Sequence, residues 1–341
     1  MALLEVTDLK TAFDTDRGLV RAVDGVSFTL EEGKTLGVVG ESGCGKSVLS
    51  RSIMNLLQKR GVHRSGQVQF DGIETTKLSL KESRKMYGTG MAMIFQDPMT
   101  SLNPVVKIGR QLTESLRLHF DMNKEFAMET AEELLRSVGI PEPKRRLSEY
   151  PHQLSGGMRQ RVVIAIALAC GPKLLFADEP TTALDVTVQK QILNLLGRQQ
   201  SERKMAMILV THDLGVVAGR ADEIMVMYAG QAVEKAPTAK LFSAMRHPYT
   251  AALLNSIPKT SDPSHTRLEA IPGRPPRLID PPDGCRFAPR CAYATDQCLT
   301  EMPPLTATEG DPEHLFRCWH PLDITPKLAA MASSSNVSVG N

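Results

Sequence analysis

The chain has 341 residues, of which 40 are basic and 38 acidic, so its formal net charge is +2. This length predicts about two domains with an ample core, and the balanced charge gives no electrostatic case for binding nucleic acid. The longest apolar run, residues 162–170, has nine residues, about half of the roughly twenty that cross a bilayer. Residues 1–6 lack the apolar segment of a signal peptide. We therefore expect a cytosolic chain that associates with a membrane only through partners.

A glycine-rich loop with the sequence GESGCGKS follows the apolar run at residues 36–39, which predicts a buried strand. Residues 48–57 come next and have apolar side chains at helical spacing. Strand, loop and helix in this order are the context that the phosphate-binding motif G-x-x-x-x-G-K-[ST] requires. Glycines let successive N–H groups face phosphates at the positive end of the helix. Lys46 would then reach the β- and γ-phosphates, and the Ser47 hydroxyl would bind Mg²⁺. The residues expected around the nucleotide are Gly40, Glu41, Ser42, Gly43, Cys44, Gly45, Lys46 and Ser47.

Two acidic residues follow another predicted strand at residues 173–177. Asp178 would hold Mg²⁺, and Glu179 could orient and deprotonate an attacking water. A strand that simply ends in two solvated acids is the alternative. The presence of a phosphate loop in the same chain favours the catalytic interpretation.

Two further apolar runs each lead into a polar side chain. The run at 91–95 ends at Gln96, whose neutral amide could contact both the Mg²⁺ shell and the water. The run at 207–211 leads to His212, which could contact the γ-phosphate. Taken alone, His212 would more often be a structural histidine, but its place after a strand that follows the acidic pair favours a catalytic role.

The stretch LSGGMRQ, residues 154–160, opens a predicted helix. A glycine pair at the start of a helix exposes N–H donors to an anion. Six features occur in an order that resembles the nucleotide-binding subunit of an ABC transporter. In chain order they are the phosphate loop, Gln96, this stretch, the acidic pair, the loop that contains Asp185, and finally His212. The resemblance covers residues 1–257.

The resemblance implies an α/β fold, the P-loop NTPase fold of ABC-type nucleotide-binding domains, with a RecA-like core and a helical subdomain at about 97–155. It also implies that two such subunits enclose two ATP molecules head to tail. An aromatic residue ahead of the phosphate loop usually stacks on adenine in this family, and Phe13 is the candidate. A core position in a strand is the alternative for Phe13. The residues that would contact the partner's nucleotide in trans are Ser155, Gly156, Gly157 and Asp185.

Apolar residues in the 97–155 segment recur at helical spacing: Ile108, Leu112 and Leu116 lie four residues apart. A second helix is predicted over residues 126–138, and Gly139 ends it. The resemblance implies that this subdomain receives the coupling helices of two membrane-spanning permease subunits. Ordinary core helices without a docking role are the alternative.

Composition changes after residue 247, where residues 247–254 predict one last helix. Thirteen of the 22 prolines lie in residues 251–341, which excludes a long helix or a continuous sheet there. We expect a small irregular C-terminal extension over 258–325 and a disordered tail over 326–341. The extension holds Cys285, Cys291, Cys298 and Cys318. Four thiols in a cytosolic module favour a metal over disulfides, and spacing alone leaves zinc and iron–sulfur equally open.

Three segments resemble the oligopeptide/dipeptide importer branch of the ABC family: FQDPMTSLNP at 95–104, YPHQ at 150–153 and GCRFAPRC at 284–291. This resemblance implies peptides as cargo and a [4Fe–4S] cluster on the four cysteines, with zinc as the alternative. It further implies a heterodimer with a second homologous ATPase, an extracytoplasmic substrate-binding protein and a peripheral location at the cytoplasmic face of the inner membrane. Nickel chelates, sugars or opines are alternative cargoes.

A soluble ABC-type ATPase of translation, chromosome structure or DNA repair is the competing class. The chain has one ATPase module, no long coiled coil and no basic stripe, and each of these features disfavours it.

Overall fold

The computed structural model describes residues 2–58, 60–182, 184–256 and 271–322. The predicted tail over 326–341 lies outside these residues, as do the first residues of the predicted extension. The chain divides into two compact units. The first unit combines Met1–Leu4, Thr29–Thr35 and Gln69–Val210, and the second combines Glu5–Phe28, Leu36–Val68 and Thr211–Asn341. Because the chain passes between the units several times, the boundary that we expect near residue 257 stays a prediction.

The sheet of the first unit contains three parallel strands whose residues are almost all buried. They are β6 (Met91–Ile94), β7 (Leu174–Asp178) and β8 (Ala206–Thr211). The strands predicted from the three apolar runs are therefore confirmed. In a parallel sheet that is covered on both faces, both sides of each strand are buried, which explains why apolar and polar residues do not alternate along these runs. The first strand ends one residue earlier than expected, so Phe95 is 38% exposed.

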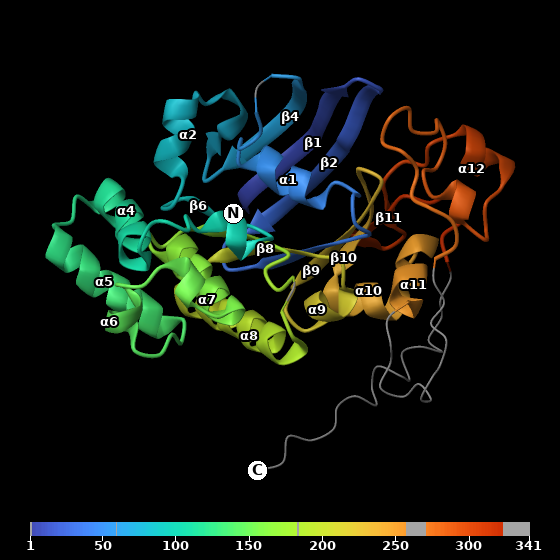
Figure 1. Cartoon of the computed structure of the whole chain (residues 1–341). Helices are drawn as coiled ribbons and strands as arrows, with labels where there is room; N and C mark the ends of the chain where they lie inside the picture. The colour runs from blue at the N-terminus through green and yellow to red at the C-terminus, as the bar shows by residue number, and fades with distance from the viewer. Residues whose placement is uncertain (1, 59, 183, 257–270, 323–341) are drawn as a thin grey trace, which may run out of the picture. The chain divides into compact units, whose positions relative to one another are not determined.

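Helices dominate the rest of the first unit, and α4, α5 and α7 pack against one another (Figure 1). The predicted helices are confirmed: α4 buries Ile108, Leu112 and Leu116, and α5 ends just before Gly139. Phe126 is 54% exposed, because the buried stripe of α5 runs instead through Ala127, Ala131, Leu134 and Leu135. The α-helices of this unit, within the described residues, are α2 (Leu80–Met86), α3 (Pro98–Ser101), α4 (Ile108–Phe120), α5 (Lys124–Ser137), α6 (Pro143–Arg146), α7 (Gly156–Leu168) and α8 (Val186–Arg203).

The second unit has a sheet in which β3 (Thr35–Val39) lies parallel to β9 (Glu223–Tyr228). On the other edge of β9, β10 (Gln231–Pro237) pairs antiparallel, and β12 (Asp311–Phe316) pairs with β10. The short strand β11 (Thr306–Thr308) completes a hairpin with β12. The C-terminal extension is therefore not wholly irregular, since it contributes two strands to the sheet that contains β9.

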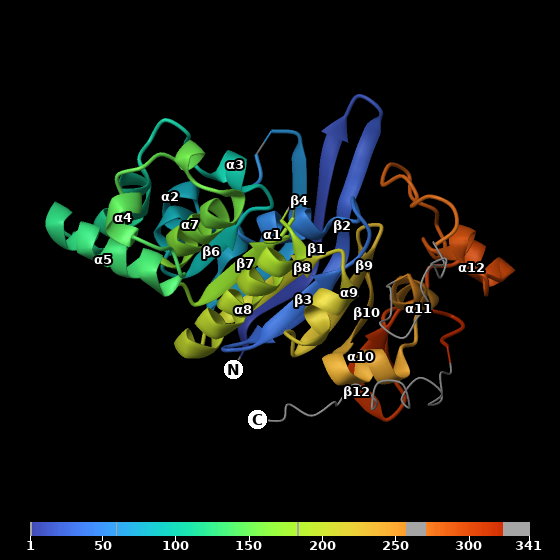
Figure 2. The ribbon, with the colours of Figure 1, turned by 60° about the horizontal axis from the view of Figure 1, so that its bottom comes forward.

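A separate four-stranded sheet contains β1 (Ala2–Thr15), β2 (Gly18–Glu31), β4 (Val62–Phe70) and β5 (Ile73–Glu74) in the order β2-β1-β4-β5. The helices of the second unit include α10, which packs against β9 and β10 (Figure 2). The predicted helix at 247–254 is confirmed but is not the last, because α12 follows it. The α-helices of this unit, within the described residues, are α1 (Lys46–Ile53), α9 (Leu214–Ala218), α10 (Thr238–Ala244), α11 (Pro248–Asn255) and α12 (Asp296–Thr300).

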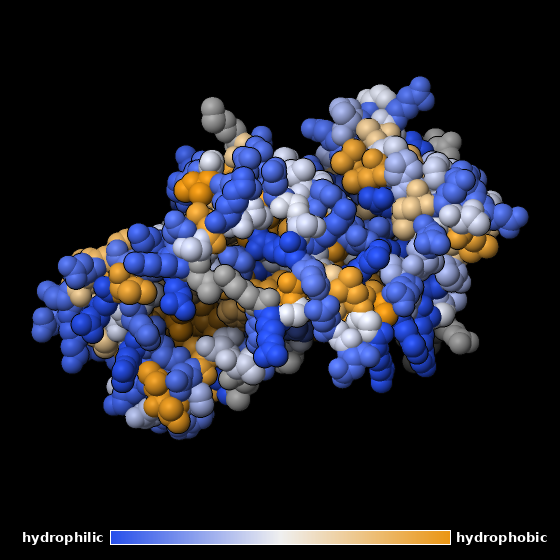
Figure 3. Space-filling model, turned by 90° about the horizontal axis from the view of Figure 1, so that it is seen from above, coloured by the Kyte–Doolittle hydropathy of each residue, from blue (hydrophilic) through white to orange (hydrophobic). Residues whose placement is uncertain are grey.

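The face of the molecule in Figure 3 is mainly hydrophilic, with apolar side chains in separate groups. Within the part of the chain that the structure describes, no helix has the length and apolar composition that crossing a bilayer requires.

Candidate nucleotide-binding site

The phosphate loop connects the end of β3 to the start of α1 in the second unit, as the sequence predicts. Its backbone is tightly wrapped. A Cβ added at Gly40 would lie 2.2 Å from the carbonyl oxygen of Met227, and one added at Gly45 would lie 2.0 Å from that of Ala22. Gly45 also has a φ of 103°, in the left-handed region that favours glycine. The loop therefore requires glycine at these two positions for steric reasons.

Lys46 is the first residue of α1 and is 5% exposed. Its ammonium group donates hydrogen bonds to the carbonyl oxygens of Gly40 (2.7 Å) and Glu41 (3.0 Å), so it lies over the loop that precedes it. Ser42 is exposed and Ser47 half-buried, while burial raises the pKa of the Cys44 thiol. An ammonium group held above a glycine-rich loop at the start of a helix forms a cationic centre for phosphate oxygens.

The acidic pair lies at the end of β7 in the first unit. Asp178 is fully buried, and Glu179 has a φ of 46°, which is uncommon for a residue with a side chain. The carboxylate of Glu179 accepts hydrogen bonds from the Gln96 amide (3.1 Å) and from the Thr182 hydroxyl (3.0 Å). Backbone strain of this kind costs about 1–3 kcal/mol and clusters at functional sites. The structure thus brings two predicted residues together and adds Thr182, a residue of the loop containing Asp185 for which no contact with Glu179 is predicted from the sequence.

The glycine pair of the LSGGMRQ stretch begins α7 in the same unit. Ser155 caps this helix, because its hydroxyl accepts a hydrogen bond from the N–H of Met158 (3.3 Å). Asp185 caps α8 in the same way. A Cβ added at Gly157 would lie 3.0 Å from Val188 of α8, so a glycine here lets the first turns of the two helices approach closely. The residues predicted to act in trans, Ser155 to Gly157 and Asp185, thus lie at the starts of two neighbouring helices.

The remaining predicted residues belong to the second unit. His212 is exposed directly after β8. Phe13 is half-buried on β1, so adenine stacking and a core position both remain open for this residue. The predicted site therefore divides between the two units: the phosphate loop, Phe13 and His212 lie in the second unit, and the acidic pair, Gln96 and the helix starts in the first.

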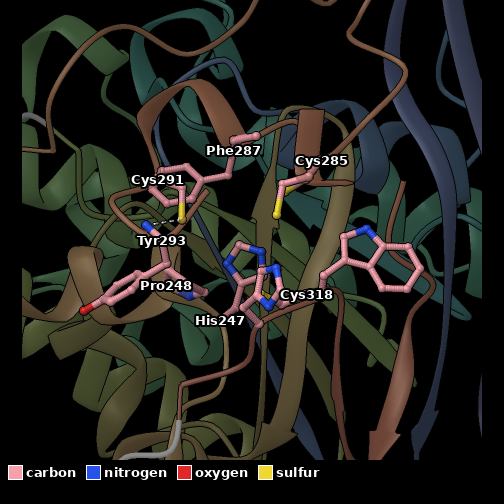
Figure 4. Close-up of a pocket in the computed structure, with 11 residues that line it drawn as sticks. His247, Pro248, Cys285, Phe287, Cys291, Tyr293 and Cys318 are labelled. Atoms are coloured by element: carbon pink, nitrogen blue, oxygen red, sulfur yellow. Dashed lines mark hydrogen bonds between the residues drawn. The ribbon is translucent and has the colours of Figure 1, made fainter. Parts of the chain in front are cut away.

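The four cysteines of the extension line one cavity in the second unit. Figure 4 shows the sulfur atoms of Cys285 and Cys291 directed toward the same space, which the ring of His247 also borders. All four are free thiols. Burial raises the pKa of Cys318 to about 12, and the neighbouring thiols raise it as well. Among the described residues, no group of three or more His, Cys, Asp or Glu side chains is arranged to hold a metal ion, so neither iron–sulfur nor zinc gains support from this geometry.

Comparison with solved structures agrees with this arrangement. The fold is similar to the dimeric ATP-binding cassette MJ0796 in a post-hydrolysis state with ADP and Pi, with a TM-score of 0.62 and 27% identity over 69% of this chain and 98% of that chain. The ABC transporter family model matches residues 23–182. Fold and motifs therefore define an ABC-type ATPase, a class of protein for which ATP and Mg²⁺ are the typical ligands.

Sequence relatives define the branch. The chain is 48% identical to the dipeptide transport ATP-binding protein DppD of Escherichia coli K12 over 95% of this chain and 98% of that protein. It is 50% identical to the oligopeptide transport ATP-binding protein OppD of Bacillus subtilis 168 over 94% of this chain and 89% of that protein. The model for the C-terminal region of oligopeptide/dipeptide transporters matches residues 233–298. The chain belongs to the ATP-binding subunits of the oligopeptide/dipeptide family of ABC transporters.

Proposed function

We propose that this chain is the ATP-hydrolysing subunit of an importer for dipeptides or oligopeptides. Its partners in this proposal are two transmembrane permease subunits, a second homologous ATPase and an extracytoplasmic substrate-binding protein. The chain would lie at the cytoplasmic face of the membrane. The observation that carries the proposal is the similarity to dipeptide and oligopeptide transport proteins, which extends through nearly the whole chain and includes the C-terminal region.

Nucleotide binding in this proposal rests on the phosphate loop. Its N–H groups and the Lys46 ammonium bind the β- and γ-phosphates, while Phe13 stacks on adenine. Mg²⁺ supplies charge neutralisation on the phosphates, and Ser47, Gln96 and Asp178 would hold it.

Hydrolysis rests on the carboxylate of Glu179, which takes a proton from the attacking water. Gln96 and Thr182 orient this carboxylate through the two hydrogen bonds that they donate. His212 contacts the γ-phosphate.

Coupling to transport rests on residues Ser155 to Gly157 and on Asp185, which complete the ATP site of the second ATPase subunit. ATP then closes the pair of subunits, closure moves the helical subdomains at 97–155, and these move the permease. The exposed apolar side chains of this segment, among them Leu118 at 78% exposure, are consistent with a docking surface.

The test is purification of the tagged chain from native membranes, followed by reconstitution. Two permease subunits and a second ATPase should co-purify, and vesicles containing the assembly should take up radiolabelled dipeptide in an ATP-dependent way. Uptake of a nickel chelate, a sugar or an opine in place of peptide would replace the cargo assignment. Recovery from the soluble fraction alone, or with ribosomes or DNA, would contradict the transport role.

We also propose that Cys285, Cys291, Cys298 and Cys318 hold a [4Fe–4S] cluster that stabilises the extension. The chemistry of the donor set motivates this proposal, because four cysteinates are the usual ligands of such clusters and all four cysteines are free thiols. Their arrangement in the described residues does not itself form a metal site. The cavity that the four cysteines line has room for about one water molecule, so binding of a cluster requires the side chains to move outward. Anaerobically purified protein should contain about four iron and four sulfide per chain. Zinc without sulfide would favour the alternative, and the absence of both metals would remove the proposal.

A further inference from the structure

Arg290 is a buried cation of the extension whose five N–H groups all have acceptors. Its side chain is 3% exposed and lies one residue before Cys291. The guanidinium forms two hydrogen bonds with the carboxylate of Glu41, at 2.6 and 3.0 Å. The other three donors reach the hydroxyl of Tyr228 and the carbonyl oxygens of Pro272 and Ile271. Complete pairing of a buried guanidinium indicates a position built for this residue.

Glu41 is the second residue of the phosphate loop, and residues outside the loop hold both its side chain and its backbone. The carboxylate pairs with Arg290, and the N–H donates a hydrogen bond to the hydroxyl of Tyr249 in α11 at 2.9 Å. The hydrogen bonds that Arg290 donates to the Glu41 carboxylate raise the pKa of Arg290 above its already high value. The loop conformation at this residue therefore depends on contacts from the C-terminal third of the chain.

A packed aromatic cluster keeps Arg290 in place. Tyr228, Tyr249 and Phe287 lie with ring centroids 4.6–5.3 Å apart, and the guanidinium carbon lies 5.8 Å from the ring of Tyr228. Arg286, four residues before Arg290, forms a second ion pair with Asp24. Ordering the long Arg290 side chain costs conformational entropy, and the packed rings and paired donors around it offset that cost.

A carboxylate inside a loop that binds a polyanion is electrostatically unfavourable unless a cation neutralises it. We infer that Arg290 is a positioning residue for nucleotide binding: it neutralises and orients Glu41, so that the phosphate loop attains its full affinity for ATP only when the extension is folded onto it. The inference rests on the proposed role of residues 40–47 in binding ATP. It assigns to the extension a direct effect on nucleotide affinity.

The experiment compares full-length variants Arg290→Met, Arg290→Lys, Glu41→Gln and the double variant Glu41→Gln/Arg290→Met. Arg317→Met is the matched control, because Arg317 also lies in the extension but its side chain donates to the carbonyl oxygens of Ala232 and Pro303, which lie outside the phosphate loop. Thermal unfolding shows which variants fold. Equilibrium binding of a fluorescent ATP analogue gives Kd, and steady-state hydrolysis of MgATP gives kcat and KM.

Arg290→Met should raise Kd and KM by about tenfold, equivalent to about 1.4 kcal/mol, with kcat changed less than about threefold. Arg290→Lys should have an intermediate effect, because an ammonium keeps the charge but not the paired geometry. The double variant should recover most of the affinity, since the uncompensated carboxylate is gone. Arg317→Met should bind as the wild type does.

Wild-type affinity in every Arg290 variant that folds would overturn the inference. Equal weakening by Arg290→Met and Arg317→Met would also overturn it, because it would show a general loss of the extension. A double variant as weak as Arg290→Met would exclude the charge argument. A wild-type chain that binds no ATP would instead refute the proposed function.

Discussion

A single methyl group at Gly45 tests whether the phosphate loop is as tightly wrapped as the structure has it. In Gly45→Ala the new Cβ would lie 2.0 Å from the carbonyl oxygen of Ala22, a separation that real Cβ atoms do not adopt. The φ of 103° adds strain for any residue with a side chain. Backbone atoms must therefore move before alanine can be accommodated.

The matched control is Gly43→Ala, because Gly43 also has a positive φ, 78°, but has no atom within 4 Å of the added Cβ. Both variants incur the cost of a left-handed conformation, about 1–2 kcal/mol. Only Gly45→Ala adds crowding, which typically costs about 1–3 kcal/mol in a packed region. The free energy of unfolding should thus be about 2 kcal/mol lower in Gly45→Ala than in the control.

The assay is thermal unfolding of both variants without nucleotide, so that loss of ligand binding does not contribute. At about 2.1 cal/mol/K of unfolding entropy per residue, a difference of 2 kcal/mol corresponds to a Tm lower by about 3 °C in a chain of 341 residues. Equal Tm values for the two variants would refute the steric reasoning and would show that the loop relaxes around a methyl group without cost.

Three further predictions follow from the same geometry. Glu179→Gln should keep ATP affinity but slow hydrolysis by about 10²–10⁴, because an amide cannot accept the proton from water; near-normal single-turnover rates would place the base elsewhere. Ser155→Ala should lower the free energy of unfolding in urea by about 1 kcal/mol through the lost cap of α7, and an unchanged midpoint would argue against that cap. Glu234→Ala should destabilise the chain by about 3 kcal/mol, because this fully buried carboxylate accepts hydrogen bonds from two backbone N–H groups and from His314; a loss below about 1 kcal/mol in urea would show that other acceptors replace it.

Local elements could be predicted where the signal lies within a few residues of sequence. The buried strands β3, β6, β7 and β8 appear as apolar runs, and α4 appears as apolar residues four apart, because burial on a strand or helix face dictates that spacing. Asp178 and Gln96 could be placed at strand ends for the same reason. Phe126 shows the limit of this reasoning, since α5 could be recognised but the face that it buries depends on its neighbours in space.

The extension shows how tertiary structure overrides composition. Its prolines suggested an irregular segment, yet β12 pairs with β10 and extends the sheet. The residues that pair, such as Glu234 with Phe316, are far apart in sequence, and no local pattern encodes such a register.

The sequence by itself determined the class of this protein, because its motifs consist of short runs in which backbone conformation and chemistry are set by adjacent residues. Gly45, Lys46 and Ser155 are of this kind. Only the tertiary structure decided how the extension meets the phosphate loop. Arg290 and Glu41 are 249 residues apart, and their ion pair exists because an aromatic cluster and a shared sheet bring the two segments together. Contacts of this kind follow from packing over the whole unit, which a motif does not contain.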